Sequence, residues 1–398
     1  MPPERSVSDW RSIRILIVAG FVAAFHVGKA AIAVPLLRAD LNLTLLVASI
    51  IVSAFATLGA LGGLAAGVAV SRLPTRGTIV TGLTIIGFAS VLGAAAPNWP
   101  LLLATRVLEG SGFLAVVIAI PSLIRTLAAP HDRAFALACW GVYLPAGSAV
   151  MMLAGPALSA YGWQGLWLVN GVTALLYAVV VWQFIPSDSV LHAVAPSGIA
   201  ANLRSVLTAP GPVLAALAFG TYTFHYFALT ALMPTLLIER MGLTVAQAGG
   251  VSAATVIANA GGNLLAGAAL RLGIPLWAII GGAFAFSGVA ALGIFADWLP
   301  VALVAILASA SLAITGLVPA SIFAATPRLA PRAHLLGITL GLVVQASNLG
   351  QLLGPAALAF WAERFGWTSA PILFAAIALT GITIALGLRV LLRDAARP

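Results

Sequence analysis

The chain has 398 residues, of which 62% are hydrophobic and 7% are charged, and its mean hydropathy is +1.11. Soluble domains carry about a quarter charged residues, so this composition excludes a water-soluble enzyme and predicts an integral membrane protein. The formal net charge is +9, but the basic residues stand between apolar segments. Insertion orientation and anionic lipid account for them there, and nucleic-acid binding is not expected.

Twelve apolar segments follow one another, each close to the about 20 residues that a helix needs to cross the hydrocarbon core. They cover residues 13–37, 43–70, 78–96, 101–127, 134–158, 164–185, 211–238, 245–270, 274–295, 299–326, 334–360 and 369–388. Most connections are short, and the exception is a Pro- and Ser-containing stretch in mid-chain. We therefore expect an all-α membrane protein with an N-terminal six-helix bundle (1–185), a cytoplasmic linker (186–210) and a C-terminal six-helix bundle (211–398).

The distribution of arginine predicts the orientation. With a cytoplasmic N-terminus, fourteen loop arginines lie on the cytoplasmic side and three, Arg38, Arg240 and Arg364, on the opposite side. This positive-inside bias places both termini in the cytoplasm. We expect a multi-pass protein of the cell's inner (plasma) membrane.

The two halves of the chain repeat at an offset of 198 to 200 residues. The matching positions are Pro35 and Pro234, Leu43-Thr44 and Leu243-Thr244, Gly62 and Gly262, Gly67 and Gly267, Pro121 and Pro319, and Gly155-Pro156 and Gly354-Pro355. A parallel duplication of two six-span units is a transporter architecture, with the substrate site at the membrane midplane between the halves.

Three motifs give the chain a resemblance to the major facilitator superfamily. The loop GVAVSRLPTR resembles that family's G-x-x-x-D-R-x-G-R-R/K loop in Gly67, Arg72 and Arg76, with Ser71 in the position of the Asp. RVLEGSG in the fourth span is similar to R-x-x-Q-G-x-G, with Glu109 replacing the Gln. Gly155-Pro156 matches part of a signature linked to exporters.

This resemblance implies the major facilitator fold and alternating access, with Gly67, Arg72 and Arg76 in a gating loop. It also implies that spans 1, 4, 7 and 10 line the cavity and that spans 3, 6, 9 and 12 face lipid. The stretch from Gly28 to Thr44 resembles the small-anion branch that includes cyanate and nitroimidazole transporters.

Ionisable side chains inside a span cost about 2.5–3.5 kcal/mol each at mid-helix, so each one is a functional hypothesis. Lys29 is the only lysine of the chain and follows His26 by three residues, which places both on one helix face. We expect Lys29 to contact an anionic substrate. The alternative is a lysine whose stem covers apolar surface while its ammonium reaches the membrane surface.

His26 and His225 are related by the repeat, and we expect Tyr222 and Tyr226, beside His225, to contact solute through their hydroxyls or rings. Because histidine titrates near physiological pH, the pair suits proton coupling as well as substrate contact. The alternative is a structural histidine bonded to a neighbouring polar group.

Arg106 and Glu109 lie three residues apart in the fourth span, a spacing at which an ion pair neutralises itself. Two interpretations stay open. The pair is mainly structural, or it couples protons, with the central carboxylate of Glu109 as the proton carrier.

Amides and aromatic residues form the last group of candidates. Gln345, Asn348 and Gln351 recur on one stripe of span 11, with Asn259 and Asn263 in span 8, and Trp140 and Tyr143 lie in span 5. We expect Gln345, Asn348, Asn259, Trp140 and Tyr143 to contact solute. The alternative for the amides is packing between membrane helices.

The central charges Lys29, Arg106 and Glu109 sum to +1 with neutral histidines, which favours an anion in a low-dielectric cavity. We therefore expect a secondary active transporter of a small anionic solute, organic or inorganic, in symport with protons. A proton-driven exporter of amphipathic compounds is the alternative. No catalytic set, cofactor or metal site is expected, and the partners are the solute, protons and the lipid bilayer around a monomer.

Overall fold

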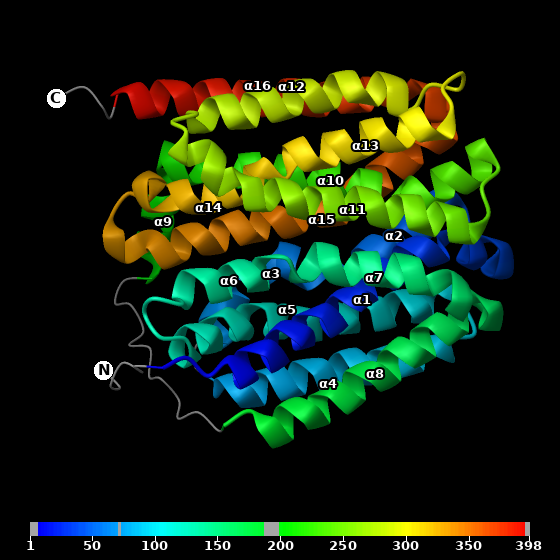
Figure 1. The fold of residues 1–398 in the computed structure, drawn as a ribbon, viewed down its shortest axis with the longest axis horizontal. Helices are drawn as coiled ribbons and strands as arrows, with labels where there is room; N and C mark the ends of the chain where they lie inside the picture. The colour runs from blue at the N-terminus through cyan, green and yellow to red at the C-terminus, as the bar shows by residue number, and fades with distance from the viewer. Residues whose placement is uncertain (1–6, 71–72, 187–198, 395–398) are drawn as a thin grey trace.

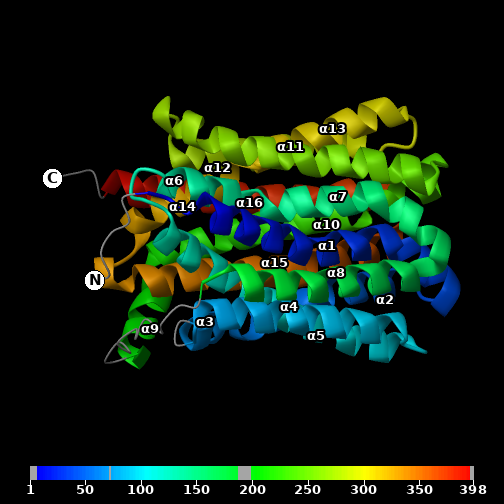
Figure 2. The ribbon, with the colours of Figure 1, turned by 60° about the horizontal axis from the view of Figure 1, so that its bottom comes forward.

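The protein is a bundle of long helices that run side by side along one direction (Figure 1). The structure, a computed structural model, describes residues 7–70, 73–186 and 199–394. Helix α1 begins and helix α16 ends at the same end of the bundle (Figures 1 and 2). We name this end the terminal face and the opposite end the distal face.

The first half of the described chain forms eight α-helices and two short 3-10 turns. They are α1 (Trp10–Leu41), α2 (Leu45–Ser53), η1 (Ala54–Ala56), α3 (Thr57–Val70), α4 (Thr75–Ala94), α5 (Trp99–Leu127), α6 (Arg133–Gly141), α7 (Tyr143–Leu158), η2 (Ser159–Tyr161) and α8 (Gly162–Phe184).

The second half follows the same plan after the short helix α9 (Ile199–Thr208). Its elements are α10 (Pro210–Met241), α11 (Val245–Arg271), α12 (Leu276–Ile294), α13 (Val301–Thr315), α14 (Leu317–Leu329), η3 (Ala333–Leu335), α15 (Leu336–Phe365), η4 (Trp367–Ser369) and α16 (Ala370–Asp394). Residues 187–198 of the expected linker lie outside the described residues, and the rest of it holds α9.

Eleven stretches of the described chain are long and apolar enough to cross a membrane. One of them, Arg133–Phe184, has 52 residues, about twice what one crossing needs. It contains α6, α7 and α8, and the chain turns within it at Gly162, whose φ is 74°. The twelve predicted spans therefore correspond to these eleven stretches.

Local sequence signals set where the spans begin and break. The side chains of Thr44 and Asn98 accept hydrogen bonds from the backbone N–H three residues on, at the starts of α2 and α5. Thr244 and Gln247 form a reciprocal capping box at the start of α11. Span 10 is interrupted at Gly316, between α13 and α14.

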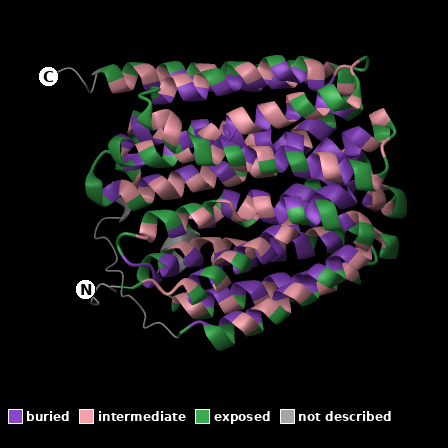
Figure 3. Cartoon of the chain, viewed as in Figure 1, coloured by how far each residue is buried: buried purple, intermediate pink, exposed green. Residues whose placement is uncertain are grey.

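The two halves of the chain lie on opposite sides of the molecule in Figure 1. Helices α4 and α8 of the first half form one edge, and α12 and α16 of the second half form the other. Buried side chains lie mainly where helices face one another, and exposed ones mainly on the outer surfaces (Figure 3). Between the halves, α15 contacts α2 and α3, α7 contacts α11, and α1 contacts α10.

The two halves are joined at the distal face by charged groups. Arg38 at the end of α1 forms an ion pair with Glu239 at the end of α10. The carboxylate of Glu363 on α15 accepts hydrogen bonds from the backbone N–H groups of Leu45 and Leu46, at the start of α2. The distal halves of α1 and α10 are buried all round, over residues 28–34 and 225–237. The halves are therefore packed together at this end.

Candidate functional site

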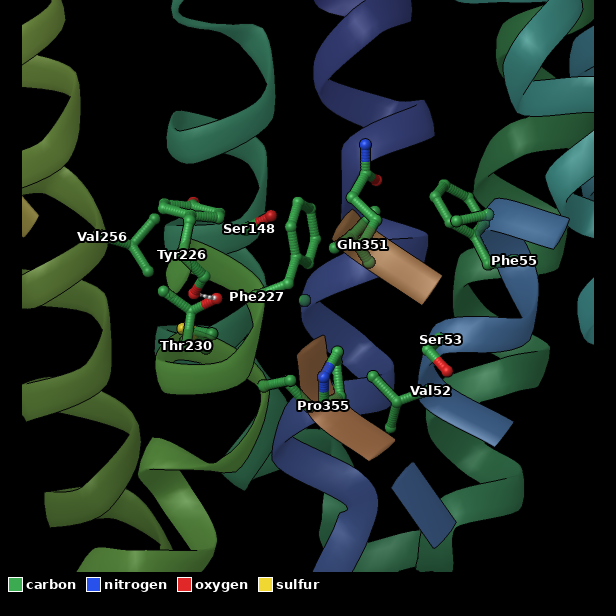
Figure 4. A pocket seen from close by; sticks show the side chains of 16 residues that line it. Val52, Ser53, Phe55, Ser148, Tyr226, Phe227, Thr230, Val256, Gln351 and Pro355 are labelled. Atoms are coloured by element: carbon green, nitrogen blue, oxygen red, sulfur yellow. Dashed lines mark hydrogen bonds between the residues drawn. The ribbon is translucent and has the colours of Figure 1, made fainter. Parts of the chain in front are cut away.

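A pocket lies between the two halves in the middle of the bundle (Figure 4). The space between its lining residues is about 460 Å³ when the open solvent at its mouth is counted, and the cavity itself has a volume of about 20 Å³, so the pocket is narrow in this conformation. Helices α1, α2, α7, α10, α11 and α15 and the η1 turn supply its sixteen lining residues. They are Val27, Gly28, Ala31, Val52, Ser53, Phe55, Ala56, Ser148, Met152, Tyr226, Phe227, Thr230, Ala231, Val256, Gln351 and Pro355.

The pocket is built from repeat-related positions that differ in character. Four pairs of lining residues are 199 positions apart: Val27 and Tyr226, Gly28 and Phe227, Ala31 and Thr230, and Met152 and Gln351. In each pair the member from the second half is bulkier or more polar. At these four positions the first half therefore contributes the smaller or less polar side chain, and the second half the aromatic or polar one.

The polar groups of the pocket are hydroxyls and one amide, and none of its described lining residues is charged. Thr230 donates to the carbonyl oxygen of Tyr226 (2.8 Å), and Gln351 donates to Oγ of Ser347 (3.3 Å). The buried Oγ of Ser148 has no hydrogen-bond partner among the described residues. A buried hydroxyl without a partner costs free energy, so it is a group that a solute can satisfy.

A buried network of charged side chains lies beside α1. Nζ of Lys29 donates to Oγ of Ser90 on α4 (2.6 Å) and to Oε1 of Glu109 on α5 (3.0 Å). It also lies 3.0 Å from Nδ1 of His26 and 4.6 Å from the ring centroid of Trp167 on α8. Lys29, His26 and Glu109 are each 0% exposed.

Arg106 completes this network from within α5. Its guanidinium pairs with the carboxylate of Glu109 and donates to the carbonyl oxygens of Ile51 (3.3 Å) and Val52 (3.4 Å). The predicted i, i+3 pair is therefore present, and the lysine shares its carboxylate. The side chain of Arg106 also ties α5 to α2.

The network and the pocket lie on opposite faces of α1. At 3.6 residues per turn, the pocket-lining Val27, Gly28 and Ala31 are rotated by about half a circle from His26 and Lys29. The pocket and the side chains of His26 and Lys29 are thus separated by the thickness of α1, whereas Arg106 reaches the pocket lining itself, at the carbonyl oxygen of Val52 and 5.3 Å from the ring centroid of Phe55.

His225 occupies the repeat-related place in the second half, in neutral surroundings. Oγ of Ser287 lies 3.1 Å from its Nδ1 and Oγ of Ser311 lies 3.4 Å from its Nε2. The ring of Phe374 meets it edge-on, with 5.3 Å between the ring centroids. Where the first half has Lys29, the second has Ala228, 199 positions on.

The sequence profile of the Major Facilitator Superfamily matches residues 16–343, which is most of the chain. The protein belongs to this superfamily. Its fold, its membrane location and its place among transporters follow from that membership.

Curated relatives from this superfamily cover only part of the chain. The 3-(3-hydroxy-phenyl)propionate transporter of Escherichia coli (strain K12) is 27% identical over 210 residues, 52% of this chain and 51% of that protein. A puromycin resistance protein of Streptomyces alboniger is 30% identical over 183 residues, 45% and 36% of the two chains. The methylenomycin A resistance protein of Bacillus subtilis (strain 168) is 27% identical over 195 residues, 47% and 41%. The matches thus span about half the length of these relatives, or less.

Solved superfamily structures match over almost the whole chain. A bacterial homolog to the human lysosomal transporter Spinster, in an inward-facing and unoccupied conformation, has a TM-score of 0.71 at 16% identity and covers 98% of this chain and 96% of its own. The inward-facing and occupied conformation gives 0.70 at 15% identity, with 95% and 94% covered. At this identity the likeness shows the fold alone.

The superfamily motifs can now be placed in this major facilitator protein. Gly67 lies near the end of α3, and Arg76, in the first turn of α4, donates to the carbonyl oxygen of Trp182 on α8. Arg72 lies outside the described residues. Gly110 in the RVLEGSG motif packs so closely on η1 that a Cβ there would collide with the backbone carbonyl of Phe55.

The expectation that spans 1, 4, 7 and 10 line the cavity needs correction. Spans 1 and 7 line the pocket as expected, but spans 4 and 10 contribute none of its lining residues. Spans 2, 5, 8 and 11 supply the rest of the lining. The polar groups of α5 point into the network, and Ser311 on α13 faces His225.

Most residues predicted to contact solute are placed outside the pocket lining, with Tyr226 inside it. His26, Lys29, Arg106 and Glu109 form the network, and His225 lies in its serine cluster. Tyr222 donates to the amide oxygen of Asn259 (3.0 Å), whose nitrogen donates to the carbonyl oxygen of Leu312 (2.9 Å).

The remaining candidates make packing contacts. Gln345 donates to the carbonyl oxygen of Ala60 (3.1 Å), which joins α15 to α3 across the halves. Asn348 donates to the carbonyl oxygen of Val344 within its own helix (2.9 Å). Trp140 stacks on Tyr143 with 4.2 Å between the ring centroids.

Sequence reasoning did not find Phe55, Phe227, Ser53, Ser148 or Thr230 as pocket residues. The two phenylalanines look like any apolar residue of a span. The repeat offset could have indicated Thr230, because this hydroxyl-bearing residue of the second half stands at the position that corresponds to Ala31 of the first half.

Proposed function

We propose that this chain is a secondary transporter of a small organic anion with an apolar or aromatic body, carried by alternating access in symport with a proton. The observation that carries this proposal is the lining of the central pocket. It combines the rings of Phe55, Tyr226 and Phe227 with hydroxyl and amide groups and no described charged side chain. Ligand sites of this kind bury an apolar body and orient it with a few polar contacts.

An inorganic anion fits this lining less well than an organic one. Nitrate or cyanate would lose its hydration without contacting a positively charged side chain. The apolar residues Val27, Gly28 and Ala31 would give it no hydrogen bond to replace those lost to water. A carboxylic acid with an aromatic body would bury its ring between the pocket walls as the two halves move apart in the transport cycle, and it needs polar partners for one end only.

The excess positive charge of the network supports an anion. Lys29 and Arg106 carry two positive charges against the single carboxylate of Glu109. A helix is about 10 Å across, and across that distance a charge pair contributes about 2 kcal/mol at an effective dielectric constant of about 20. This attraction would come through α1 and not from direct contact with Lys29.

The relative from Escherichia coli named for 3-(3-hydroxy-phenyl)propionate agrees with such a solute. We further propose that the protein lies in the inner (plasma) membrane as a monomer, with the terminal face in the cytoplasm. The positive-inside distribution of arginine supports that orientation.

The test is uptake by proteoliposomes under an inward pH gradient. The panel holds 3-(3-hydroxyphenyl)propionate, its neutral methyl ester, nitrate, cyanate and puromycin. Gln351→Leu removes the amide of the pocket and is expected to raise KM for the accepted acid about tenfold. Gln345→Leu, on the same helix but bonded to α3, is the matched control and is expected to change stability more than KM.

Gradient-driven accumulation of the aromatic acid, with nitrate and cyanate excluded, is the expected result. Uptake of nitrate or cyanate in preference to the acid would overturn the proposal.

Export of amphipathic compounds is the second candidate function. The resistance proteins among the relatives and the uncharged pocket favour it. Puromycin extrusion against its gradient, without uptake of the aromatic acid, would establish this candidate in place of the first.

A further inference from the structure

We propose that Lys29 is the group that holds the coupled proton and that His26 passes it on by changing its tautomer, while Glu109 stays ionised throughout. This inference rests on the proton coupling proposed above. It differs from the sequence-based hypothesis, which gave the proton to Glu109 or to a histidine.

The ionisable groups that face Lys29 come from two helices. They are His26 on α1 and Arg106 and Glu109 on α5. Helices α4 and α8 present the neutral side chains of Ser90 and Trp167, and Tyr143 of α7 stacks on Trp140 instead. The proton therefore belongs to one member of a set of four.

Glu109 is held by cations on both carboxylate oxygens. Its Oε1 accepts from Lys29 at 3.0 Å, and its Oε2 pairs with Arg106. A proton on this carboxylate would leave two buried cations without a counter-charge, the most costly arrangement of the set. Arg106 cannot take the role either, because a guanidinium keeps its proton in proteins.

Lys29 is the member whose loss of a proton makes the set neutral. As an ammonium it is the second cation beside a single carboxylate. As an amine it still has two N–H bonds, enough to donate to Ser90 and to Glu109. Ser90 stays an acceptor in both states, since its own hydroxyl donates to the carbonyl oxygen of Trp167 (2.6 Å).

The two contacts of His26 Nδ1 correspond to the two states. When Lys29 is an ammonium, its third N–H donates to a bare Nδ1 at 3.0 Å, and the ring proton is on Nε2. When Lys29 is an amine, Nδ1 carries the proton and donates to Oε2 of Glu109 at 3.2 Å. Nε2 is buried and has no hydrogen-bond partner among the described residues, so it is the ring nitrogen left for a water molecule that enters as the helices move.

Release of the proton takes two coupled transfers. The Nζ–H bond of Lys29 breaks as the Nδ1–H bond of His26 forms, and the Nε2–H bond breaks as its proton passes to a water molecule. The imidazole is neutral before and after, and Lys29 changes from ammonium to amine. Uptake of a proton reverses these steps, and an anion in the pocket across α1 favours the protonated state.

The first measurement needs no solute. Because the chain has one lysine, labelling with [ζ-¹⁵N]lysine gives a single side-chain NMR signal from the purified full-length protein. That signal is expected to change from ammonium to amine as the pH is raised to about 9, a loss of charge documented for buried lysines in other proteins. A signal that stays that of an ammonium up to about pH 9 would overturn the proposal.

The second measurement compares variants in proteoliposomes by two assays. Solute exchange at equal pH moves no net proton, whereas accumulation driven by a pH gradient does. Lys29→Met is expected to lose accumulation and to keep exchange at saturating solute within about threefold of wild type, with a higher KM because one positive charge behind α1 is gone. His26→Gln is expected to slow accumulation about tenfold or more, in keeping with the loss of a proton-transfer group.

His225→Gln is the matched control, since His225 is the repeat-related histidine without charged partners. It is expected to accumulate solute as wild type does. Accumulation by Lys29→Met at the wild-type level would overturn the proposal. If the wild type exchanges none of the panel, the proposed function fails, and the NMR titration still decides the fate of Lys29.

Discussion

His26 and His225 stand 199 positions apart at equivalent places in the two halves, and only His26 touches charged side chains. Its ring contacts Lys29 and Glu109, whereas His225 contacts the hydroxyls of Ser287 and Ser311. Each half of the fold therefore holds a buried histidine at this position, and only the histidine of the first half has charged neighbours. The duplication alone does not account for the charged network.

Replacement of His225 tests this asymmetry through stability. His225→Leu leaves the hydroxyls of Ser287 and Ser311 without their ring partner, and it is expected to lower stability by about 1–2 kcal/mol. Thermal unfolding of the detergent-purified protein measures this loss. The pH dependence of transport should stay that of wild type, and a changed pH profile would mean that the second half also exchanges protons.

Removal of the shared carboxylate should cost more than removal of the lysine. Glu109→Gln leaves Arg106 and Lys29 buried without a counter-charge, and the expected loss is about 3–5 kcal/mol. Lys29→Met keeps the Arg106 pair intact and should cost about 2 kcal/mol less. The two unfolding temperatures are compared with that of Ser111→Ala, whose exposed hydroxyl bonds only to its own helix. Equal losses in the two variants would contradict this picture of the network.

Gly110 is expected to tolerate no side chain. In Gly110→Ala the new Cβ meets the backbone carbonyl of Phe55, which cannot move aside as a side-chain tip can, and the expected cost is about 1–3 kcal/mol. Gly261→Ala is the matched control, because a Cβ there meets nothing within 4 Å, and it should be neutral or slightly stabilising. Folded yield and unfolding temperature measure both. An unchanged Gly110→Ala protein would show that α5 and η1 separate easily.

The carboxylate of Glu363 is expected to hold the distal face closed. Glu363→Gln weakens the hydrogen bonds to Leu45 and Leu46 at the positive end of α2, a loss of about 1 kcal/mol. A loss of this size corresponds to about a fivefold larger population of molecules that are open at the distal face, compared with wild type. Spin labels on the exposed residues Ala160 and Ala246, in a variant with Cys139 replaced, report the distance between the halves. A distance distribution identical to that of wild type would assign the closure to other contacts.

The twelve spans and the buried ion pair could be predicted from the sequence because both depend on local order along the chain. Apolar length sets a span, and a three-residue spacing brings Arg106 to Glu109. The shared face of His26 and Lys29 follows from the same spacing.

The direction in which that face points could not be predicted. His26 and Lys29 turn toward α4, α5 and α8, and Val27, Gly28 and Ala31 turn toward the pocket. The sequence places both sets in one span and does not say which neighbours surround each side. For the same reason Gln351 and Gln345, two turns apart on one helix, could not be told apart as a pocket residue and a packing contact.

The position of α1 between the pocket and the network has an evolutionary consequence. Substitutions at Val27 and Ala31 reshape the surface that meets a solute without touching His26 and Lys29 behind it. Under the proposed function, the face of α1 that meets the solute and the face that meets the ions can thus change separately. New solutes become accessible to such a protein by changes on a single helical stripe, while the means of driving them across the membrane is inherited intact.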